Sequence, residues 1–177
     1  MRWQHAATLV AFSLAACGGP GPADPPPQDD RYTVPARCSS GLARDPNESE
    51  SPDMMPGRAC NACHARENAA SGEADAPIYA FAGTVFPTGH EPDDCTAPAA
   101  EGAQVIVTDA KGATFTAAVN RVGNFLLEGV TMAPPFHAKV VFQGRELAMK
   151  APQVSGDCNQ CHSAAGEQLA KGRIPLP

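Results

Sequence analysis

The sequence predicts a mainly β protein, with a small antiparallel β-sandwich between two irregular segments and a disordered tether at the N-terminus. Between Ile78 and Met149, short runs of alternating or β-branched residues are separated by turn residues. The 18 prolines and 16 glycines among 177 residues leave little room for long helices. Several short strands at this spacing are typical of a sandwich.

The first element is a predicted export leader at residues 1–16. Arg2 supplies a positive charge, and the apolar stretch Ala6 to Ala16 is too short to span a bilayer. The following Leu14-Ala-Ala-Cys17-Gly18 resembles the lipobox of bacterial lipoproteins, which implies that Cys17 is lipidated and becomes the mature N-terminus. Because Gly18 stands where an inner-membrane retention signal has Asp, the resemblance implies an outer-membrane lipoprotein, periplasmic or surface-exposed. Ordinary cleavage after an A-x-A-like site is the alternative.

Residues 17–35 form the second element, a tether rich in proline and aspartate. It has too few apolar residues to fold, so we expect a disordered, semi-stiff spacer. Residues 36–77 continue polar and turn-rich, with a short helix expected over Ala65 to Ala76. The tether is expected to hold the folded part clear of the membrane.

Residues 78–150 are expected to form the sandwich, and residues 151–177 a second irregular segment. Six strands are expected, at Tyr79–Phe86, Gln104–Thr108, Thr114–Val119, Asn124–Leu127, Phe136–Phe142 and Glu146–Met149. The turn residues at 109–112 and 120–123 each predict a hairpin-type connection. The long loop Pro87 to Gly102 contains Cys95.

Part of this region resembles the carboxypeptidase regulatory-like, transthyretin-like sandwich. The resemblance rests on Gly83-Thr-Val85, on the Val105-x-Val107-x-Asp109-x-x-Gly112 run, and on Val119-Asn-x-x-Gly123-x-Phe125. It implies a structural or adhesive module without catalytic residues. The sequence departs from that family in the long loop around Cys95, and in Asn120, where the family often has Thr-Asp.

The strongest chemical signal is the pattern Cys-X-X-Cys-His, which occurs as Cys60-Asn-Ala-Cys63-His64 and as Cys158-Asn-Gln-Cys161-His162. This pattern is the attachment signal of c-type haem. The two thiols reach the two vinyl groups of the porphyrin, while the adjacent imidazole coordinates the iron. Each copy also has Asn directly after its first cysteine. The sequence therefore predicts two covalently bound haem c groups per chain, and residues 36–77 are expected to be the first haem-binding segment.

Two of the seven cysteines remain after Cys17 and the four motif cysteines are assigned. They are Cys38 and Cys95, an even pair in an oxidising compartment. An intramolecular disulfide between them would constrain the unfolded chain. The alternatives are free thiols or pairing between molecules.

The sixth ligand of each iron is open. His90 and His137 are the two histidines outside the motifs in the mature chain, and a count of four histidines permits bis-histidine ligation at both haems. His137 would project from its strand, and the alternative is a solvated surface residue. His90 lies in a loop, with the same alternative. Among the methionines, Met149 is the preferred candidate, ahead of Met132, although a strand methionine more often packs in a core.

Two methionines lie just before the first motif. Met54 and Met55 are close to Cys60 in sequence, rather close to reach around to the distal face of the same haem, and either could serve the other haem. A methionine ligand raises the potential of a haem relative to a histidine.

The function predicted from the sequence is electron transfer by an envelope-anchored dihaem c-type cytochrome, with redox proteins as partners and a lipid anchor as the only membrane contact. Without its leader the chain has 12 basic and 19 acidic residues, a net charge of −7, so nothing indicates nucleic-acid binding. The alternative is a non-redox envelope sandwich whose Cys-X-X-Cys pairs bind zinc or form disulfides.

Enzymatic functions, a dihaem peroxidase or a thiol–disulfide oxidoreductase, are less favoured. The chain is short for the peroxidase and shows no distal acid–base arrangement. The oxidoreductase requires a βαβ pattern that the sequence does not show.

Overall fold

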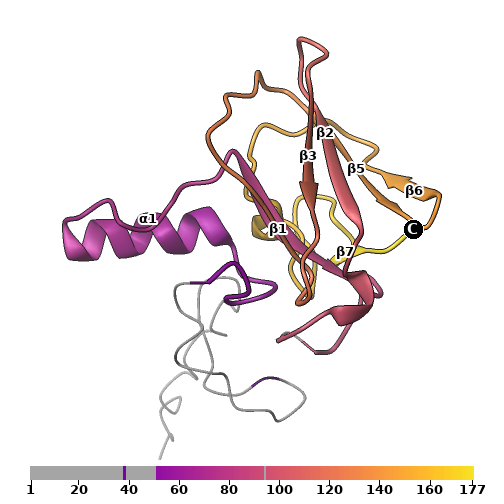
Figure 1. The fold of residues 1–177 in the computed structure, drawn as a ribbon, viewed down its shortest axis with the longest axis horizontal. Coiled ribbons are helices and arrows are strands. Elements are labelled where there is room, and N and C mark those ends of the chain that lie inside the picture. The colour runs from indigo at the N-terminus through magenta and orange to yellow at the C-terminus, as the bar shows by residue number, and fades with distance from the viewer. Residues whose placement is uncertain (1–37, 39–50, 94) are drawn as a thin grey trace, which may run out of the picture.

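The computed structural model describes residue 38 and residues 51–93 and 95–177. The predicted leader, the tether and the lipidation site Cys17 lie outside these residues. Within the described part, two sheets pack face to face, and one helix projects from them (Figure 1). The elements in chain order are α1 (Cys60–Ser71), β1 (Phe81–Phe86), η2 (Pro98–Ala100), β2 (Gln104–Thr108), β3 (Thr114–Ala118), β4 (Asn124–Leu127), β5 (His137–Phe142), β6 (Arg145–Ala148), η3 (Cys158–Gln160) and β7 (Ile174–Pro175).

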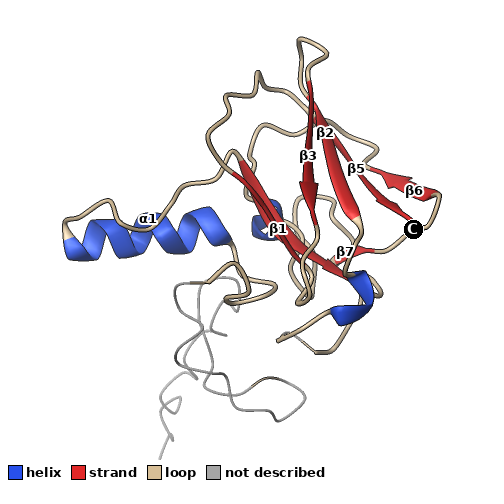
Figure 2. Ribbon diagram, viewed as in Figure 1, coloured by secondary structure: helices blue, strands red, loops and turns tan. Residues whose placement is uncertain are grey.

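The two sheets confirm the predicted mainly β fold and its sandwich character (Figure 2). One sheet has the strand order β3-β2-β5-β6 and is antiparallel throughout. The other has the order β4-β1-β7, in which β1 pairs with β4 antiparallel and with β7 in parallel. The six predicted strands are all present, with bounds that differ by two residues at most.

The apolar core lies between the sheets. Its largest members come from β1, β4 and the central strands of the larger sheet; they are Phe81, Val85, Phe86, Val105, Val107, Phe125, Phe136 and Val140. Every residue of β1 is buried, unlike the half-exposed strands of the larger sheet. A strand buried on both faces must be covered on its outer side as well. The segments that carry the two Cys-X-X-Cys-His motifs contribute that cover.

Two local predictions were wrong. The first haem segment is not irregular throughout, because α1 begins at Cys60 and ends at Ser71, where the Gly72 that follows adopts φ 75° and its N–H bonds to Asn68 O. The predicted helix over Ala65 to Ala76 therefore started too late and ended too late. The turn at 120–123 does not form a hairpin, because β3 and β4 belong to different sheets and the turn connects them.

Candidate functional site

The two Cys-X-X-Cys-His motifs lie side by side against β1. The first occupies the N-terminal turn of α1, and the second forms η3. Two hydrogen bonds join them across the sequence: Ala62 N donates to Asp157 Oδ2 at 2.9 Å, and Asn159 Nδ2 donates to Arg58 O at 2.9 Å. In Figure 1 the N-terminal end of α1 faces the sandwich, while its other end points away.

Asp157 caps the helix of the other motif. The N-cap residue of α1 is Ala59, whose side chain has no acceptor for the free N–H groups of the first turn. Asp157, 95 positions after Ala62, accepts from Ala62 N, the third N–H of the helix, which is the group that an N-cap side chain ordinarily binds. Asp157 directly precedes Cys158, so this bond fixes the two motifs relative to each other.

The asparagine found after the first cysteine of each motif has the same task in both. Asn61 accepts from Tyr79 N at 2.8 Å and donates to Tyr79 O at 2.9 Å. Asn159 accepts from Thr84 N at 3.2 Å and donates to Thr84 Oγ1 at 3.1 Å. Each amide thus pairs with the chain at or just before β1. The pairing also explains why β1 begins after Tyr79, whose backbone groups are bound by a side chain instead of by a strand.

A glycine lets the second motif approach β1 closely. A Cβ on Gly83 would lie 2.7 Å from Cζ of Phe125 and 3.0 Å from Cβ of Cys158. Real Cβ atoms do not tolerate the first distance, so only glycine fits here. Cys158 consequently packs against the apolar core.

Both motif histidines are held in the same way. His64 Nδ1 lies 2.5 Å from Pro77 O, and His162 Nδ1 lies 2.9 Å from Gly172 O. A carbonyl oxygen only accepts hydrogen bonds, so each Nδ1 carries a hydrogen and Nε2 is the ring nitrogen left for a metal. This is the arrangement by which proteins orient metal-bound imidazoles.

His64 is buried and His162 is partly buried. Burial lowers the pKa of His162, and its bond to Gly172 O opposes this lowering only in part. His64 is 5% exposed, and its ring centroid lies 5.6 Å from that of Tyr79. A neutral imidazole with a free Nε2 is the form that coordinates a metal.

A cavity of about 430 Å³ adjoins the first motif. Cys60, Cys63 and His64, the three chemical groups of the motif, all line it. The remaining wall includes Tyr79 and Leu126, and the methionines at positions 54 and 55. Such a size and a largely apolar wall are typical of sites for small molecules and cofactors.

The motif cysteines are half-buried and do not form disulfides. Burial, followed by the charge of Asp157, raises the pKa of Cys60 to about 12. The same two causes, with a further contribution from Cys60, raise that of Cys158 to about 12. Although a helix N-terminus ordinarily lowers a thiol pKa, burial and the nearby carboxylate outweigh it here. Both groups are therefore thiols, not thiolates, at neutral pH.

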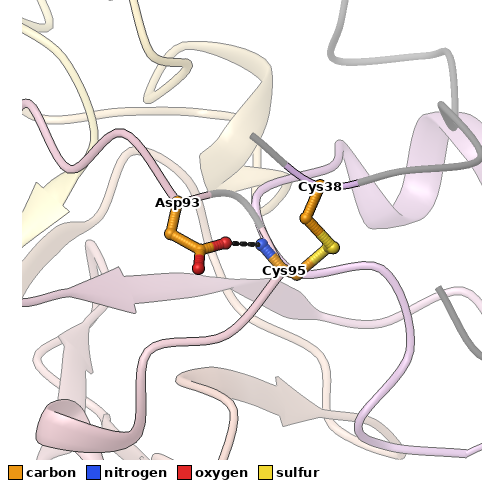
Figure 3. A group of neighbouring side chains, drawn as sticks. All are labelled: Cys38, Asp93 and Cys95. Atoms are coloured by element: carbon orange, nitrogen blue, oxygen red, sulfur yellow. Dashed lines mark hydrogen bonds between the residues drawn. A yellow bond between two sulfur atoms is a disulfide. The ribbon is translucent and has the colours of Figure 1, made fainter. Parts of the chain in front are cut away.

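The predicted Cys38–Cys95 disulfide is present, with a Cα–Cα distance of 5.5 Å (Figure 3). Asp93 lies beside it and accepts a hydrogen bond from Cys95 N at 2.9 Å. Of the residues that the structure describes, these three are the one group of three or more His, Cys, Asp or Glu residues with ligand atoms within 4.8 Å of one another. Bonded sulfurs are not thiolates, so this group is not a metal site.

The four motif thiols are not arranged as a zinc site. Zinc–sulfur bonds of about 2.3 Å in a tetrahedron bring the sulfurs to about 4 Å from one another. No three of the motif ligand atoms lie within 4.8 Å of one another in the described chain. The geometry of the motifs therefore does not favour the four-thiolate alternative.

The three preferred candidates for a sixth ligand lie away from the first-motif cavity. His137 is the exposed first residue of β5, and Met149 follows β6, where its N–H bonds to Ala138 O. Both belong to the larger sheet, whereas Asn124 and Leu126 of the smaller sheet line the cavity. His90 lies beside Gly172. A Cβ atom on Gly172 would be 3.4 Å from Cε1 of His90. Their ligation of iron stays a prediction.

The residues that sequence reasoning missed are the ones that assemble the site. Asp157 and Thr84 carry no motif of their own, and their partners are remote in sequence. One feature of the sequence could have indicated a remote partner. Ala59 is a poor N-cap, so α1 requires a hydrogen-bond acceptor from elsewhere in the chain. The repeated asparagine was visible, but its structural role was not.

Comparisons with models of known families, with curated proteins and with solved structures found no match for this chain. Its resemblance to the carboxypeptidase regulatory-like sandwich and to lipoproteins stays a prediction. Within residues 51–93 and 95–177, no helix has the length and apolar character needed to cross a bilayer.

Proposed function

We propose that this protein is a dihaem c-type cytochrome that is attached to the bacterial outer membrane through Cys17 and transfers electrons. The observation that carries the proposal is the identical arrangement of His64 and His162. In each, Nδ1 is bonded to a backbone carbonyl and Nε2 is left to coordinate iron. Zinc bound by four cysteines or structural disulfides would not require a histidine oriented in this way at either motif.

The residues present fit the group. Cys60 and Cys63 would hold the first haem and Cys158 and Cys161 the second, with His64 and His162 as proximal ligands. Each thioether forms when a thiol S–H adds across a vinyl C=C bond, which needs no oxidant. Cysteines that are protonated and not in disulfides are suited to that addition. When bound, haem supplies a one-electron cycle between ferrous and ferric iron.

The common platform on β1 supports electron exchange between the two sites. Asp157 and Asn159 hold the second motif directly against the start of α1. The protein would fix the position of the two motifs relative to each other and would keep their thiols and imidazoles partly out of water. The acidic surface, with a net charge of −7 after removal of the leader, would suit partner proteins that carry a basic docking surface.

The alternatives explain fewer observations. A non-redox sandwich with zinc-bound or disulfide-bonded Cys-X-X-Cys pairs remains the main rival, but the thiols are neither clustered for zinc nor joined as disulfides. A thiol–disulfide oxidoreductase needs a nucleophile with a lowered pKa, whereas that of Cys60 is raised. Although α1 does place a Cys-X-X-Cys at a helix start, it lies beside mostly antiparallel sheets rather than in a βαβ unit.

The test is haem content, measured on chains matured with their own leader in a host that assembles c-type cytochromes. The pyridine haemochrome spectrum of the wild type should show two thioether-linked haems per chain. The variants Cys60→Ser/Cys63→Ser and Cys158→Ser/Cys161→Ser should each show one. Colourless protein from a host whose control cytochrome matures normally would refute the proposal and leave the non-redox sandwich.

A further inference from the structure

We infer that the first haem takes its sixth ligand from the methionine pair at positions 54 and 55. This inference rests on the proposed function and concerns the same site. The sequence favoured histidines or Met149, because Met54 and Met55 stand so few residues before Cys60. The fold places them differently: both line the cavity that the thiols of Cys60 and Cys63 and the ring of His64 also line.

A turn brings these methionines back to the cavity despite the short connection. Met55 adopts φ 46°, a left-handed conformation that is uncommon for a residue other than glycine. Its carbonyl accepts from Arg58 N at 3.2 Å, which closes a turn between the methionines and α1. The chain therefore reverses direction before Cys60 and does not run straight away from the motif.

Hydrogen bonds from the rest of the fold hold the loop that carries Met54 and Met55 on both sides of the pair. Asn124, 4% exposed and itself part of the cavity wall, donates through Nδ2 to Met54 O at 2.8 Å and to Pro52 O at 3.1 Å. On the other side of the pair, Gly57 N donates to the buried Thr84 Oγ1 at 2.8 Å. A loop whose backbone is already held beside the cavity loses little further backbone freedom when one of its side chains binds a metal.

The other groups lining the cavity are weaker candidates for the iron. Tyrosine is a known haem ligand, but the ring of Tyr79 packs against that of His64, the proximal ligand, with the ring centroids 5.6 Å apart. The remaining polar members of the wall, such as Arg66 and Asn124, are not haem ligands. A thioether is, and methionine ligation raises the haem potential relative to histidine.

The experiment compares two double variants of the matured protein, each with two methionines replaced by leucine. Met54→Leu/Met55→Leu removes the inferred ligand. Met132→Leu/Met149→Leu is the matched control, because Met132 lines a separate cavity and Met149 follows β6. The readout is the weak sulfur-to-iron charge-transfer band of the ferric protein, followed by absorption and by near-infrared magnetic circular dichroism, together with the two midpoint potentials.

We expect the band in the wild type and in the control, and its loss in Met54→Leu/Met55→Leu, together with a lower potential for one of the two haems. A band that persists in that variant, or that disappears in the control, would overturn the inference. If Met54→Leu/Met55→Leu does not accumulate, the control alone decides. Met1 lies in the predicted leader, so Met54 and Met55 are the two methionines left in the matured control. A band that survives in the control therefore comes from one of them, and a band that is lost came from Met132 or Met149.

Failure of the inference can be told from failure of the proposed function. A wild type with two thioether-linked haems but no methionine band refutes the methionine ligand and leaves the dihaem cytochrome standing. A wild type without haem refutes both.

Discussion

At the scale of single residues, Thr84 shows how the site depends on buried polar groups. Its side chain is 1% exposed and meets three other segments of the chain. Oγ1 donates to Asn124 Oδ1 at 2.8 Å and accepts from Gly57 N and Asn159 Nδ2. One hydroxyl thus connects β1 with β4, with the loop before α1 and with the second motif.

Replacing Thr84 by valine is expected to lower the free energy of unfolding by about 2 kcal/mol, because a buried donor or acceptor that loses its partner costs about 1–3 kcal/mol. Urea unfolding of the matured protein measures this change. Thr84→Ser keeps the hydroxyl and is the matched control, expected to lose clearly less. A loss in Thr84→Ser as large as that in Thr84→Val would contradict the dominant role given to the hydrogen bonds of the hydroxyl.

Asp109, in the turn after β2, stabilises the fold to an extent that depends on pH. Its carboxylate accepts from Ala133 N at 3.0 Å, and from Ala113 N and Lys111 N at 2.9 Å. These bonds, that from Ala133 above all, hold its pKa below the ordinary value. Because the pKa of Asp109 is lower in the folded than in the unfolded chain, the ionised side chain stabilises the fold. This stability is fully present above the unfolded-state pKa of about 4 and is lost as the pH falls through the folded-state pKa.

Asp109→Asn is therefore expected to be less stable than the wild type at pH 7, with a difference that shrinks once the pH is below the ordinary aspartate pKa of about 3.9. In acid the wild-type side chain is also uncharged, so the two proteins become alike. Urea unfolding across this pH range measures the difference. A difference that stays constant with pH would contradict the assigned cause.

At the scale of elements, α1 depends on a residue from the far end of the chain. Asp157→Ala is expected to cost about 1 kcal/mol of stability, the usual effect of losing an N-cap. Asp157→Asn retains an oxygen acceptor, and Asn and Asp cap helices about equally well, so it should cost much less. Urea unfolding of both variants measures the costs. If alanine and asparagine behave alike, Asp157 does not act as a cap.

The sequence predicted the strands well because their signal is local. Alternation and β-branched residues marked β2 and β4 at the observed bounds, and turn residues marked the β2–β3 hairpin. The start of α1 was missed because its cap is not local: Ala59 offers no acceptor, and Asp157 is far away in sequence. The turn at 120–123 was misread because a turn motif does not reveal which sheet the next strand joins.

In the candidate site, too, local sequence patterns were visible and contacts between distant residues were not. The cysteines and histidines of the two motifs were visible in the sequence because the pattern typical of covalent haem attachment is a fixed run of five residues. The carbonyl partners of His64 and His162 were not, since Pro77 and Gly172 lie in loops whose path depends on the whole fold. For the same reason the sequence did not show that Met54 and Met55 line the same cavity as Cys60, Cys63 and His64.

At the scale of the whole molecule, the disulfide Cys38–Cys95 connects the chain before the first motif to the loop after β1. The bonded residues are 57 positions apart. In the chain-entropy model, closing a loop of this length stabilises the folded state by about 4 kcal/mol. Cys38→Ser/Cys95→Ser should lose up to about this amount in thermal or urea unfolding. A double variant as stable as the wild type would show that the bond does not constrain the unfolded chain.

The overall layout brings together two motifs that are almost one hundred positions apart in sequence (about one-half of the chain) by running both against the fully buried strand β1. In the proposed function, the sandwich is the scaffold that sets the relation between the two motifs and the haems that they would hold. Neither motif is expected to hold its place without the other, because the first supplies the helix end and the second supplies its cap.

The central claim is that each of the two motifs holds one covalently bound haem. The most direct measurement is the intact mass of the purified, matured wild-type chain after denaturation and acidic solvent extraction, which removes haem that is not covalently bound. We predict a chain that still carries two haem masses. A mass equal to that of the processed polypeptide alone, from a host that loads its control cytochrome, would contradict the account.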